Sequence, residues 1–297
     1  MLPMSSLRTW ILATRPVTLT AAIIPVLAGA ALARADQAAM RWTLFWLALL
    51  GAILIQIGTN FVNDAKDFER GTDTGERLGP LRVTQAGLLT APVVMRGAWI
   101  AFALATLCGI PLVIAGGMPI VAIGLGSIIA AYAYTGGPYP LGYHGFGELF
   151  VILFFGVIAV GGTYYLQTGS LNMHAVLGGL AIGCLSSVLL AVNNLRDESG
   201  DRISGKKTLV VRFGRNFGLA EIAILALLPF LLSLYWWVQN LRMTALMPLF
   251  ALPLALLVIR RSSTDSGSAL NRVLKLAAAL HAGYGILLSA GLLMDAA

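Results

Sequence analysis

The chain has 297 residues, of which 58% are hydrophobic and only 11% are charged, and its formal net charge is +7. A soluble domain of this size carries about 25% charged residues, so this chain has too few polar side chains to cover a water-soluble body. Its basic residues lie in short segments between apolar runs, a distribution that argues against a nucleic-acid-binding surface. Cys108 and Cys184 lie in apolar runs without a CxxC pattern, so we interpret both as buried thiols.

The apolar residues are grouped into runs long enough to cross a lipid bilayer. About 20 consecutive apolar residues form a helix that crosses the bilayer core. Nine such runs follow one another, at about 17–35, 44–62, 94–115, 118–135, 148–166, 174–194, 217–238, 243–259 and 270–294. We therefore predict an all-α polytopic membrane protein with nine transmembrane helices in a single domain, residues 1–297.

The basic residues between these runs predict how the protein is oriented. If the N-terminus is cytoplasmic, 17 of the 20 Lys and Arg residues lie on the cytoplasmic side and 3 lie on the other side. Short cytoplasmic loops of membrane proteins are enriched in Lys and Arg. The sequence thus predicts a multi-pass protein of the bacterial cytoplasmic (inner) membrane, with its N-terminus in the cytoplasm.

Eight of the 13 acidic residues occur in two of these loops, one after the second run and one after the sixth. Four crossings separate the two loops, so both face the predicted cytoplasmic side. The residues of interest are Asn60, Asn63, Asp64, Asp67 and Asp73 at the end of the second run and in the loop after it, and Asn193, Asp197 and Asp201 at the end of the sixth run and in the loop after it. Residues three or four apart share one face of a helix. If each helix continues through its cluster, an amide and two carboxylates in each are directed to one point.

Carboxylates this close together destabilise each other unless a cation lies among them. Magnesium fits this role, because it binds one or two carboxylates and leaves its other positions for water and phosphate oxygens. Basic residues follow each cluster, namely Arg77 and Arg82 in one loop and Arg202, Lys206 and Lys207 in the other. This combination indicates a site that binds a diphosphate and stabilises the charge that develops as it leaves. The repeated order of elements also suggests two pseudo-repeated halves that meet at one site.

The two motifs resemble those of the UbiA superfamily of intramembrane prenyltransferases, which have nine helices, an NxxxDxxxD-like first motif and a DxxxD second motif. Asp197-xxx-Asp201 matches the second motif. Asn60-xxx-Asp64 matches the beginning of the first, but position 68 is Phe, and the next acids are Asp67 and Asp73. This spacing is similar to that of one branch, the 1,4-dihydroxy-2-naphthoate polyprenyltransferases of menaquinone synthesis.

Further segments of the chain, to about residue 215, resemble the same branch. They are Arg77-x-Gly79-Pro80-x-Arg82, Arg15-Pro16-x-Thr18-Leu19, the stretch from Tyr134 to Tyr143, Asn193-Asn194-Leu195-Arg196-Asp197, and Gly205-Lys206-Lys207-Thr208-Leu209. The resemblance implies transfer of a polyprenyl chain from polyprenyl diphosphate to 1,4-dihydroxy-2-naphthoate. Carbon dioxide and diphosphate are lost, and a demethylmenaquinone is formed.

The resemblance also implies a role for each candidate residue. Asp64, Asp67, Asp197 and Asp201 would hold Mg²⁺ on the diphosphate, and Lys206 would act with them in catalysis. Tyr139 and Tyr143 would stabilise the allylic cation through their rings. The other predicted substrate-binding residues are Asn60, Asn63, Asp73, Arg77, Arg82, Asn193 and Arg196.

Two other functions and two other residues stay open at this point. Another prenyltransferase, with an acceptor such as 4-hydroxybenzoate, is one alternative. A secondary transporter is another, although such proteins place ionisable residues near the bilayer midplane, and the predicted spans have no acid there. Arg15 either binds the carboxylate of the acceptor or only marks the start of the first span. Glu148 is a candidate for supporting the site from the start of the fifth span.

Overall fold

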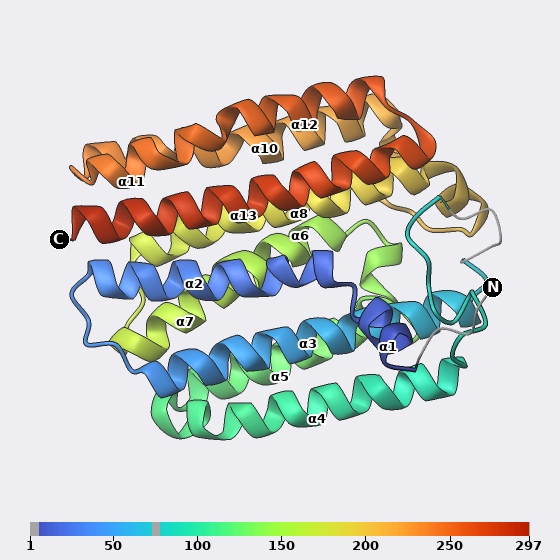
Figure 1. Ribbon diagram of the computed structural model, residues 1–297, viewed down its shortest axis with the longest axis horizontal. Coiled ribbons are helices and arrows are strands. Elements are labelled where there is room, and N and C mark those ends of the chain that lie inside the picture. Colours follow the sequence, from blue (N-terminus) through green and yellow to red (C-terminus); the bar gives the residue numbers. More distant parts are fainter. Residues whose placement is uncertain (1–5, 73–77, 297) are drawn as a thin grey trace.

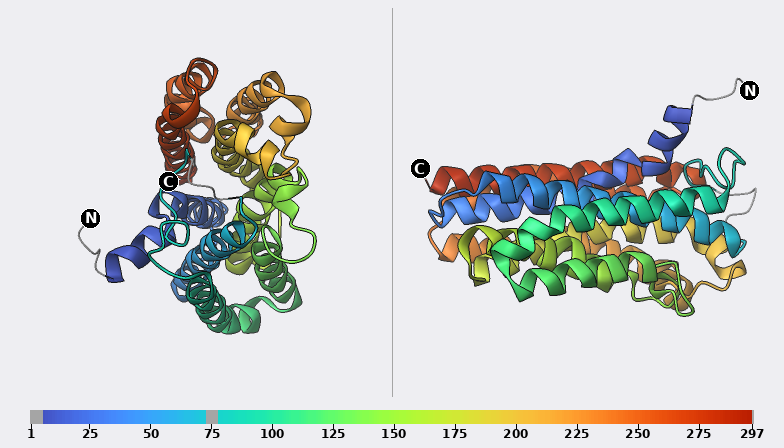
Figure 2. Two further views of the ribbon diagram at one scale, coloured as in Figure 1. Left: turned by 90° about the vertical axis from the view of Figure 1, so that its right-hand side faces the viewer. Right: turned by 90° about the horizontal axis from the view of Figure 1, so that it is seen from below.

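A computed structural model of the protein describes residues 6–72 and 78–296. In these two ranges the chain forms helices and turns, and it contains no strand. The long helices run side by side along one axis (Figure 1), and in the end-on view of Figure 2 they are seen down their axes as a bundle. The start of the first described helix, at Ser6, and the end of the last, at Asp295, lie at opposite ends of this bundle.

The first part of the chain begins with a short helix at one end of the bundle and continues into four long ones. The elements are α1 (Ser6–Thr14), the 3₁₀ turn η1 (Pro16–Leu19), α2 (Thr20–Ala35), α3 (Trp42–Glu69), α4 (Ala91–Gly116) and α5 (Met118–Ala133). Helices α4 and α5 are joined at Gly117, whose φ of 68° suits a residue without a side chain.

The second part of the chain contains the longest helix and the helices that surround it. The elements are η2 (Leu141–Tyr143), α6 (Gly147–Ile152), η3 (Leu153–Ile158), α7 (Ala159–Thr168), α8 (Met173–Ile203), α9 (Leu209–Phe213), α10 (Arg215–Val238), α11 (Arg242–Leu246), η4 (Met247–Ala251), α12 (Leu252–Thr264), η5 (Gly267–Ala269) and α13 (Leu270–Asp295). Of these, α6, η3 and α7 form one continuous span in which η3 is a π-helical segment.

Eight helical stretches in the described residues are long and apolar enough to cross a membrane. The predicted run at 118–135 forms α5, which has only 16 residues and is therefore about 24 Å long. It is shortened because the chain turns at Gly117 before it and at Gly136 and Gly137 after it. The all-helical membrane architecture is confirmed, whereas nine full spans are not.

Two helices extend well beyond the apolar runs that predict them, and this matters for the acidic clusters. Helix α3 continues to Glu69 and α8 continues to Ile203. Asp64, Asp67, Asp197 and Asp201 therefore all lie in the last turns of helices, as the spacing argument requires.

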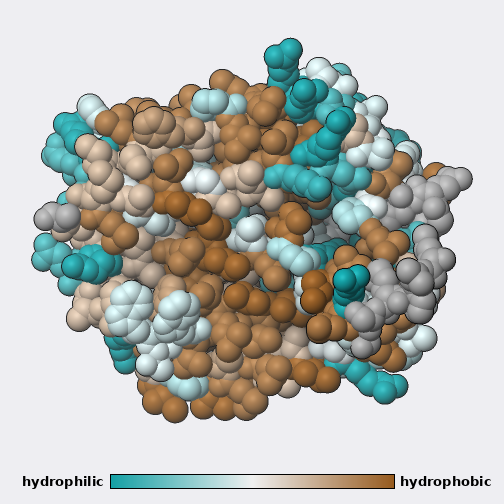
Figure 3. Space-filling model, viewed as in Figure 1, coloured by the Kyte–Doolittle hydropathy of each residue, from teal (hydrophilic) through white to brown (hydrophobic). Residues whose placement is uncertain are grey.

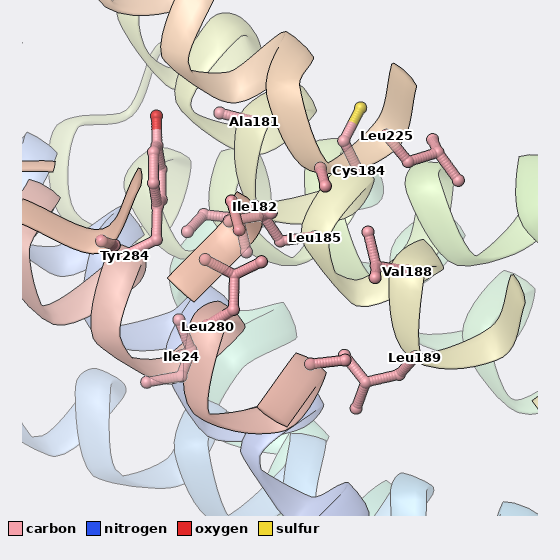
Figure 4. Packing of buried hydrophobic residues seen from close by; sticks show 14 of the residues in the cluster. Ile24, Ala181, Ile182, Cys184, Leu185, Val188, Leu189, Leu225, Leu280 and Tyr284 are labelled. Atoms are coloured by element: carbon pink, nitrogen blue, oxygen red, sulfur yellow. The ribbon is translucent and has the colours of Figure 1, made fainter. Parts of the chain in front are cut away.

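Helix α8 is the centre of the main core and packs against α2, α10 and α13. In Figure 4, Ile182 and Leu185 of α8 lie in one cluster with Ile24 of α2 and Leu280 of α13, and both of these residues lie on the same side of the α8 pair. The helices approach closely because small residues face one another: a Cβ added to Gly183 would lie 2.6 Å from the carbonyl oxygen of Ile152. Close approach through small residues is typical of helix packing in membranes.

The surface carries the signature of a protein embedded in lipid. In Figure 3 hydrophobic residues cover the middle of the visible face, and hydrophilic residues gather toward its two ends. Many large apolar side chains are exposed, among them Ile114 at 81%, Phe250 at 77% and Leu231 at 63%. Contiguous apolar surface on this scale is unsuited to water, so the protein is an integral membrane protein.

Candidate active site

The ends of α3 and α8 bring the two acidic clusters together at the end of the bundle that carries α1 (Figure 1). The ammonium nitrogen of Lys206 lies 3.7 Å from Oδ1 of Asp67, which belongs to α3. The same nitrogen lies 3.6 Å from Oδ1 of Asp201, which belongs to α8. Two segments more than 100 residues apart in sequence therefore form one site, as the sequence predicts.

Asp67 is surrounded by positive charge. Its side chain is only 3% exposed, and its Oδ2 accepts a hydrogen bond of 2.6 Å from Nη1 of Arg82. Its Oδ1 accepts a hydrogen bond of 2.7 Å from the hydroxyl of Tyr143. Burial, and then the Asp67 carboxylate, raise the pKa of Tyr143, so this hydroxyl stays protonated and donates. The Tyr143 ring also lies under Lys206 and Arg70, at 4.7 Å and 5.1 Å from its centroid.

The side chains of Asn60 and Asp64 do not point to the same place as that of Asp67, although the helical spacing predicts that all three do. Both carboxylate oxygens of Asp64 are buried and accept backbone N–H groups, from Thr84 at 3.0 Å and from Val83 at 3.2 Å. The amide of Asn60 donates to the carbonyl oxygen of Thr14 at 2.8 Å. The segment that returns over α3 buries peptide groups that need partners. Asp64 supplies these partners, so it fixes the segment that carries Arg82.

The second cluster is also divided between two directions. Asp201 faces Lys206, as described above. Asp197 forms a bidentate pair with the neighbouring Arg196, with N···O distances of 2.8 Å and 2.6 Å. The third guanidinium nitrogen of Arg196 donates to Oδ1 of Asn271. The Arg196 side chain is therefore held by other protein groups and is not directed at Lys206. Asn193 lines the large cavity described below.

The carboxylates fit a magnesium ion that is completed by substrate. In the described ranges, no group of three or more Asp, Glu, His or Cys side chains is close enough to hold a metal alone. However, the Lys206 ammonium lies 3.7 Å from Asp67 and 3.6 Å from Asp201, so these two carboxylates face one common point. Magnesium needs only one or two carboxylates when water and phosphate oxygens supply its other ligands. The donor set therefore fits such an ion.

The segment 134–146 joins the two acidic clusters across the site. The carbonyl oxygen of Gly137 accepts a hydrogen bond of 2.6 Å from Arg70, which follows α3. On the other side, the carbonyl oxygen of Tyr143 accepts one of 2.8 Å from the backbone N–H of Lys207. Tyr139, in the same segment, is 56% exposed, and its ring stacks on His144 at a centroid distance of 3.6 Å.

Two of the predicted site residues, Asp73 and Arg77, lie outside the described residues. Asn63, by contrast, lies at the boundary between the ionic site and the cavity. Its side-chain oxygen accepts a hydrogen bond of 2.7 Å from the hydroxyl of Thr135, and its backbone carbonyl accepts one of 2.9 Å from Arg82.

A cavity of about 600 Å³ begins beside these residues and continues between the helices. Arg15 is the one charged residue among the described residues that line it. The other polar groups at this end are the amides Gln56, Asn60, Asn63 and Asn193, and the remainder of the lining is mainly apolar, reaching Leu112, Ile114 and Leu166 near the opposite end of the bundle. The exposed residues Ile110, Ile114 and Leu125 also line it, so the cavity reaches the lipid-facing side of α4 and α5.

Tyr134 is a candidate functional residue to which the sequence analysis assigns no role. It follows the last residue of α5 and lines the cavity near its polar end. Glu148, at the start of α6, is buried nearby and accepts a hydrogen bond of 2.6 Å from Asn194. The sequence contains Tyr134 in a segment of interest, but it does not show which of the tyrosines faces inward.

Comparison with known proteins places this geometry in a family. The model of the UbiA prenyltransferase family matches residues 22–279. The chain belongs to the UbiA prenyltransferase family. Relatives within it include the 1,4-dihydroxy-2-naphthoate octaprenyltransferase of Haemophilus influenzae, 36% identical over 82% of this chain and 84% of the relative. The enzyme of the same description from Mycobacterium tuberculosis is 40% identical over 78% of this chain and 80% of its own length.

Solved structures of the family share the fold at lower sequence identity. A UbiA homologue from Aeropyrum pernix K1 is 15% identical, with a TM-score of 0.71 over 94% of this chain and 97% of that one. A UbiA homologue from Archaeoglobus fulgidus, bound to DMAPP and Mg²⁺, is 16% identical, with a TM-score of 0.67 over 95% of this chain and 99% of that one. The predicted family and fold class are thereby confirmed.

Proposed function

We propose that this protein transfers a polyprenyl chain from a polyprenyl diphosphate to 1,4-dihydroxy-2-naphthoate, with loss of diphosphate and carbon dioxide. The observation that carries the proposal is that an ionic site and an apolar cavity adjoin each other. A cationic site around Asp67 and Lys206 lies beside a long apolar cavity, so one molecule with a diphosphate head and a hydrocarbon tail fits both. The relatives described above, which carry this activity in their names, support the choice of acceptor.

The diphosphate end of the donor is assigned to the cluster around Asp67. Asp67 and Asp201, with Asp197 beside them, are the residues that would hold Mg²⁺. When bound, this ion supplies positive charge that offsets the charge developing on the departing diphosphate. Arg82 and Lys206 face the same carboxylate and bind diphosphate oxygens once the donor arrives. Asp64 acts indirectly, because it holds the segment that carries Arg82.

The hydrocarbon tail of the donor is assigned to the cavity. Along α3 the lining residues extend from Asn63 to Ala48, which is about 22 Å at 1.5 Å per residue. A long polyprenyl chain exceeds this length, and the exposed lining residues Ile110, Ile114 and Leu125 give it contact with lipid.

The transfer itself is balanced without a further reagent. The allylic C–O bond breaks and its electron pair goes to the diphosphate oxygen. The ring carbon that bears the carboxylate then gives an electron pair to the allylic carbon. The bond from the ring to the carboxylate breaks, carbon dioxide leaves, and that electron pair restores the aromatic ring. Tyr134, which lines the cavity near the ionic site, presents an aromatic ring where the allylic cation forms.

The carboxylate of the acceptor is assigned to Arg15. This residue lines the polar end of the cavity and adopts a left-handed backbone conformation, with φ of 51°. A residue with a side chain rarely adopts this conformation, and such residues cluster at ligand-binding sites. A guanidinium group pairs well with a carboxylate because two parallel hydrogen bonds form.

We predict that Arg15→Gln raises the KM for dihydroxynaphthoate about 10- to 100-fold, as expected when a charged hydrogen bond of about 1.5–3 kcal/mol is lost. The KM for the polyprenyl diphosphate should stay within about twofold. Steady-state kinetics with each substrate varied in turn make the measurement, and Arg15→Lys, which keeps the charge, should fall between wild type and Arg15→Gln. Equal increases in both KM values would contradict the assignment.

The proposal also includes a location and an orientation. We propose that the protein lies in the cytoplasmic membrane of a bacterium, with its N-terminus and its ionic site facing the cytoplasm. The distribution of 17 basic residues on this side against 3 on the other supports it. Labelling of single cysteines introduced into the loops, with a reagent that does not cross the membrane, tests it.

Competition between acceptors tests the choice of aromatic substrate. Purified protein is given farnesyl diphosphate and Mg²⁺ with equal amounts of dihydroxynaphthoate and 4-hydroxybenzoate, and the products are identified by mass spectrometry. We expect the prenylated and decarboxylated naphthalene product. Predominance of prenylated 4-hydroxybenzoate would show that the acceptor is wrong while the prenyl transfer is right.

A further inference from the structure

Asn271, the second residue of α13, joins the two acidic segments from a part of the chain that carries no motif. Its side-chain oxygen accepts a hydrogen bond of 2.8 Å from Nη1 of Arg196 in α8. Its side-chain nitrogen donates a hydrogen bond of 2.7 Å to the carbonyl oxygen of Leu78. Helix α13 therefore contacts both the second acidic cluster and the segment that follows the first.

On the α8 side, this contact controls the direction of the Asp197 carboxylate. Nε and Nη2 of Arg196 form the bidentate pair with Asp197, and Nη1 is bound by Asn271. The Arg196 side chain is only 2% exposed, so no solvent replaces a lost partner. A guanidinium group is planar and rigid, so the bond to Asn271 fixes its rotation. The two parallel hydrogen bonds then fix the plane of the carboxylate.

On the other side, the contact holds the start of the segment 78–89. Arg82 lies four residues after Leu78 and reaches Asp67 in the site. The same segment is held further along by Asp64, which accepts the N–H groups of Val83 and Thr84. The Leu78 carbonyl is thus a second point of attachment for this segment.

An amide fits this position better than other side chains. Its oxygen accepts from the guanidinium and its nitrogen donates to the carbonyl, and these are opposite hydrogen-bonding roles in one planar group. An aspartate at 271 would keep the first contact but would place a second acceptor against the Leu78 carbonyl. A leucine of similar size would lose both contacts.

We propose that Asn271 is a positioning residue for the diphosphate site, orienting Asp197 through Arg196 and holding the Arg82 segment through Leu78. The inference rests on the proposed function, because it takes Asp197 and Arg82 as groups that act on the donor. Residues that orient the ligands of a metal typically change affinity by about 10- to 100-fold when they are replaced. Asn271 should therefore affect binding of the donor and of Mg²⁺, and it should leave the KM of the aromatic acceptor unchanged.

The test measures binding without turnover, using purified protein and farnesyl thiolodiphosphate, an analogue whose C–S bond resists cleavage. Its affinity is measured by calorimetry over a range of Mg²⁺ concentrations, with no acceptor present. We expect Asn271→Leu to weaken binding of the analogue about tenfold and to raise the half-saturating Mg²⁺ concentration about tenfold. Asn271→Asp should change each of these two quantities about threefold. Tyr284→Phe is the matched control, because it removes another interhelical hydrogen bond of α13, to the carbonyl oxygen of Pro229, far from the site.

A second measurement separates the inference from the proposed function. Hydrogen exchange is followed at the backbone amides of Val83 and Thr84 in protein without metal or ligand. We expect faster exchange in Asn271→Leu than in wild type, and no change in Tyr284→Phe. If wild type binds the analogue and Asn271→Leu binds equally well, the inference is wrong. If wild type does not bind the analogue, the proposed function is wrong. The exchange measurement then still tests the inference, which is wrong if the amides of Val83 and Thr84 exchange at the same rate in Asn271→Leu as in wild type.

Discussion

Replacing Asp67 with Asn should lower kcat/KM for the polyprenyl diphosphate by about 10²–10³-fold, the usual effect of removing one electrostatic stabiliser from an active site. Asp67 is the carboxylate shared by Arg82, Tyr143 and Lys206. An amide keeps the shape of the side chain but removes the charge that orders Arg82 and Lys206 and that would bind Mg²⁺. Initial rates over a range of donor and Mg²⁺ concentrations give the measurement.

Glu69→Gln is the matched control for this variant. It changes an acid to an amide two residues along the same helix, but Glu69 is exposed, and its ion pair among the described residues is with the half-buried Lys66, at 2.8 Å. A pair of this kind contributes at most about 1 kcal/mol, so we expect activity near that of wild type. Thermal unfolding of both variants in detergent distinguishes loss of function from loss of structure. Near-normal turnover in a folded Asp67→Asn protein would show that the metal and diphosphate site lies elsewhere.

Filling the cavity at Gly124 should make the protein selective for short donors. Gly124 lines the cavity, and a Cβ added there meets no atom within 4 Å, so a larger side chain enters open space. It lies ten residues before Tyr134, which is about 15 Å along α5. We expect Gly124→Phe to lower kcat/KM for octaprenyl diphosphate about 10- to 100-fold, because forcing groups into a filled space costs about 1–3 kcal/mol. Activity with geranyl diphosphate, whose tail is a quarter as long, should change little.

Gly126 provides the control, because a Cβ added to it also meets no atom within 4 Å but it does not line the cavity. Gly126→Phe adds the same side chain to the same helix and should leave the preference for tail length unchanged. Parallel assays with geranyl, farnesyl and octaprenyl diphosphate measure the profile. If Gly124→Phe used all three donors in the wild-type ratio, the tail would lie outside this cavity.

Much of the fold is predictable from the sequence because hydrophobic runs and basic loops reflect the bilayer directly. The continuation of α3 and α8 through the acidic clusters is predictable too, since Asp67 and Asp201 occur at helical spacing after apolar helices. The length of α5 is less predictable, because hydropathy continues to residue 135 while the helix stops at Ala133. Glycines that turn the chain, rather than polarity, determine that end.

The side-chain directions in the site could not be read from spacing alone. Asp64 and Asp67 are three residues apart and share a helix face, yet Asp64 binds the backbone of Val83 and Thr84 while Asp67 binds Arg82. What separates them is the path of the segment after α3, which depends on tertiary contacts. The role of Asn271 is invisible in the sequence for the same reason: its partners are 75 and 193 residues away.

The most direct test of the account is a single reaction with purified protein, dihydroxynaphthoate, octaprenyl diphosphate and Mg²⁺. We expect equal amounts of prenylated, decarboxylated product, diphosphate and carbon dioxide, and we expect none of them to form when Mg²⁺ is removed with a chelator. Release of diphosphate without a prenylated ring, or product formation that is unchanged by the chelator, would contradict it.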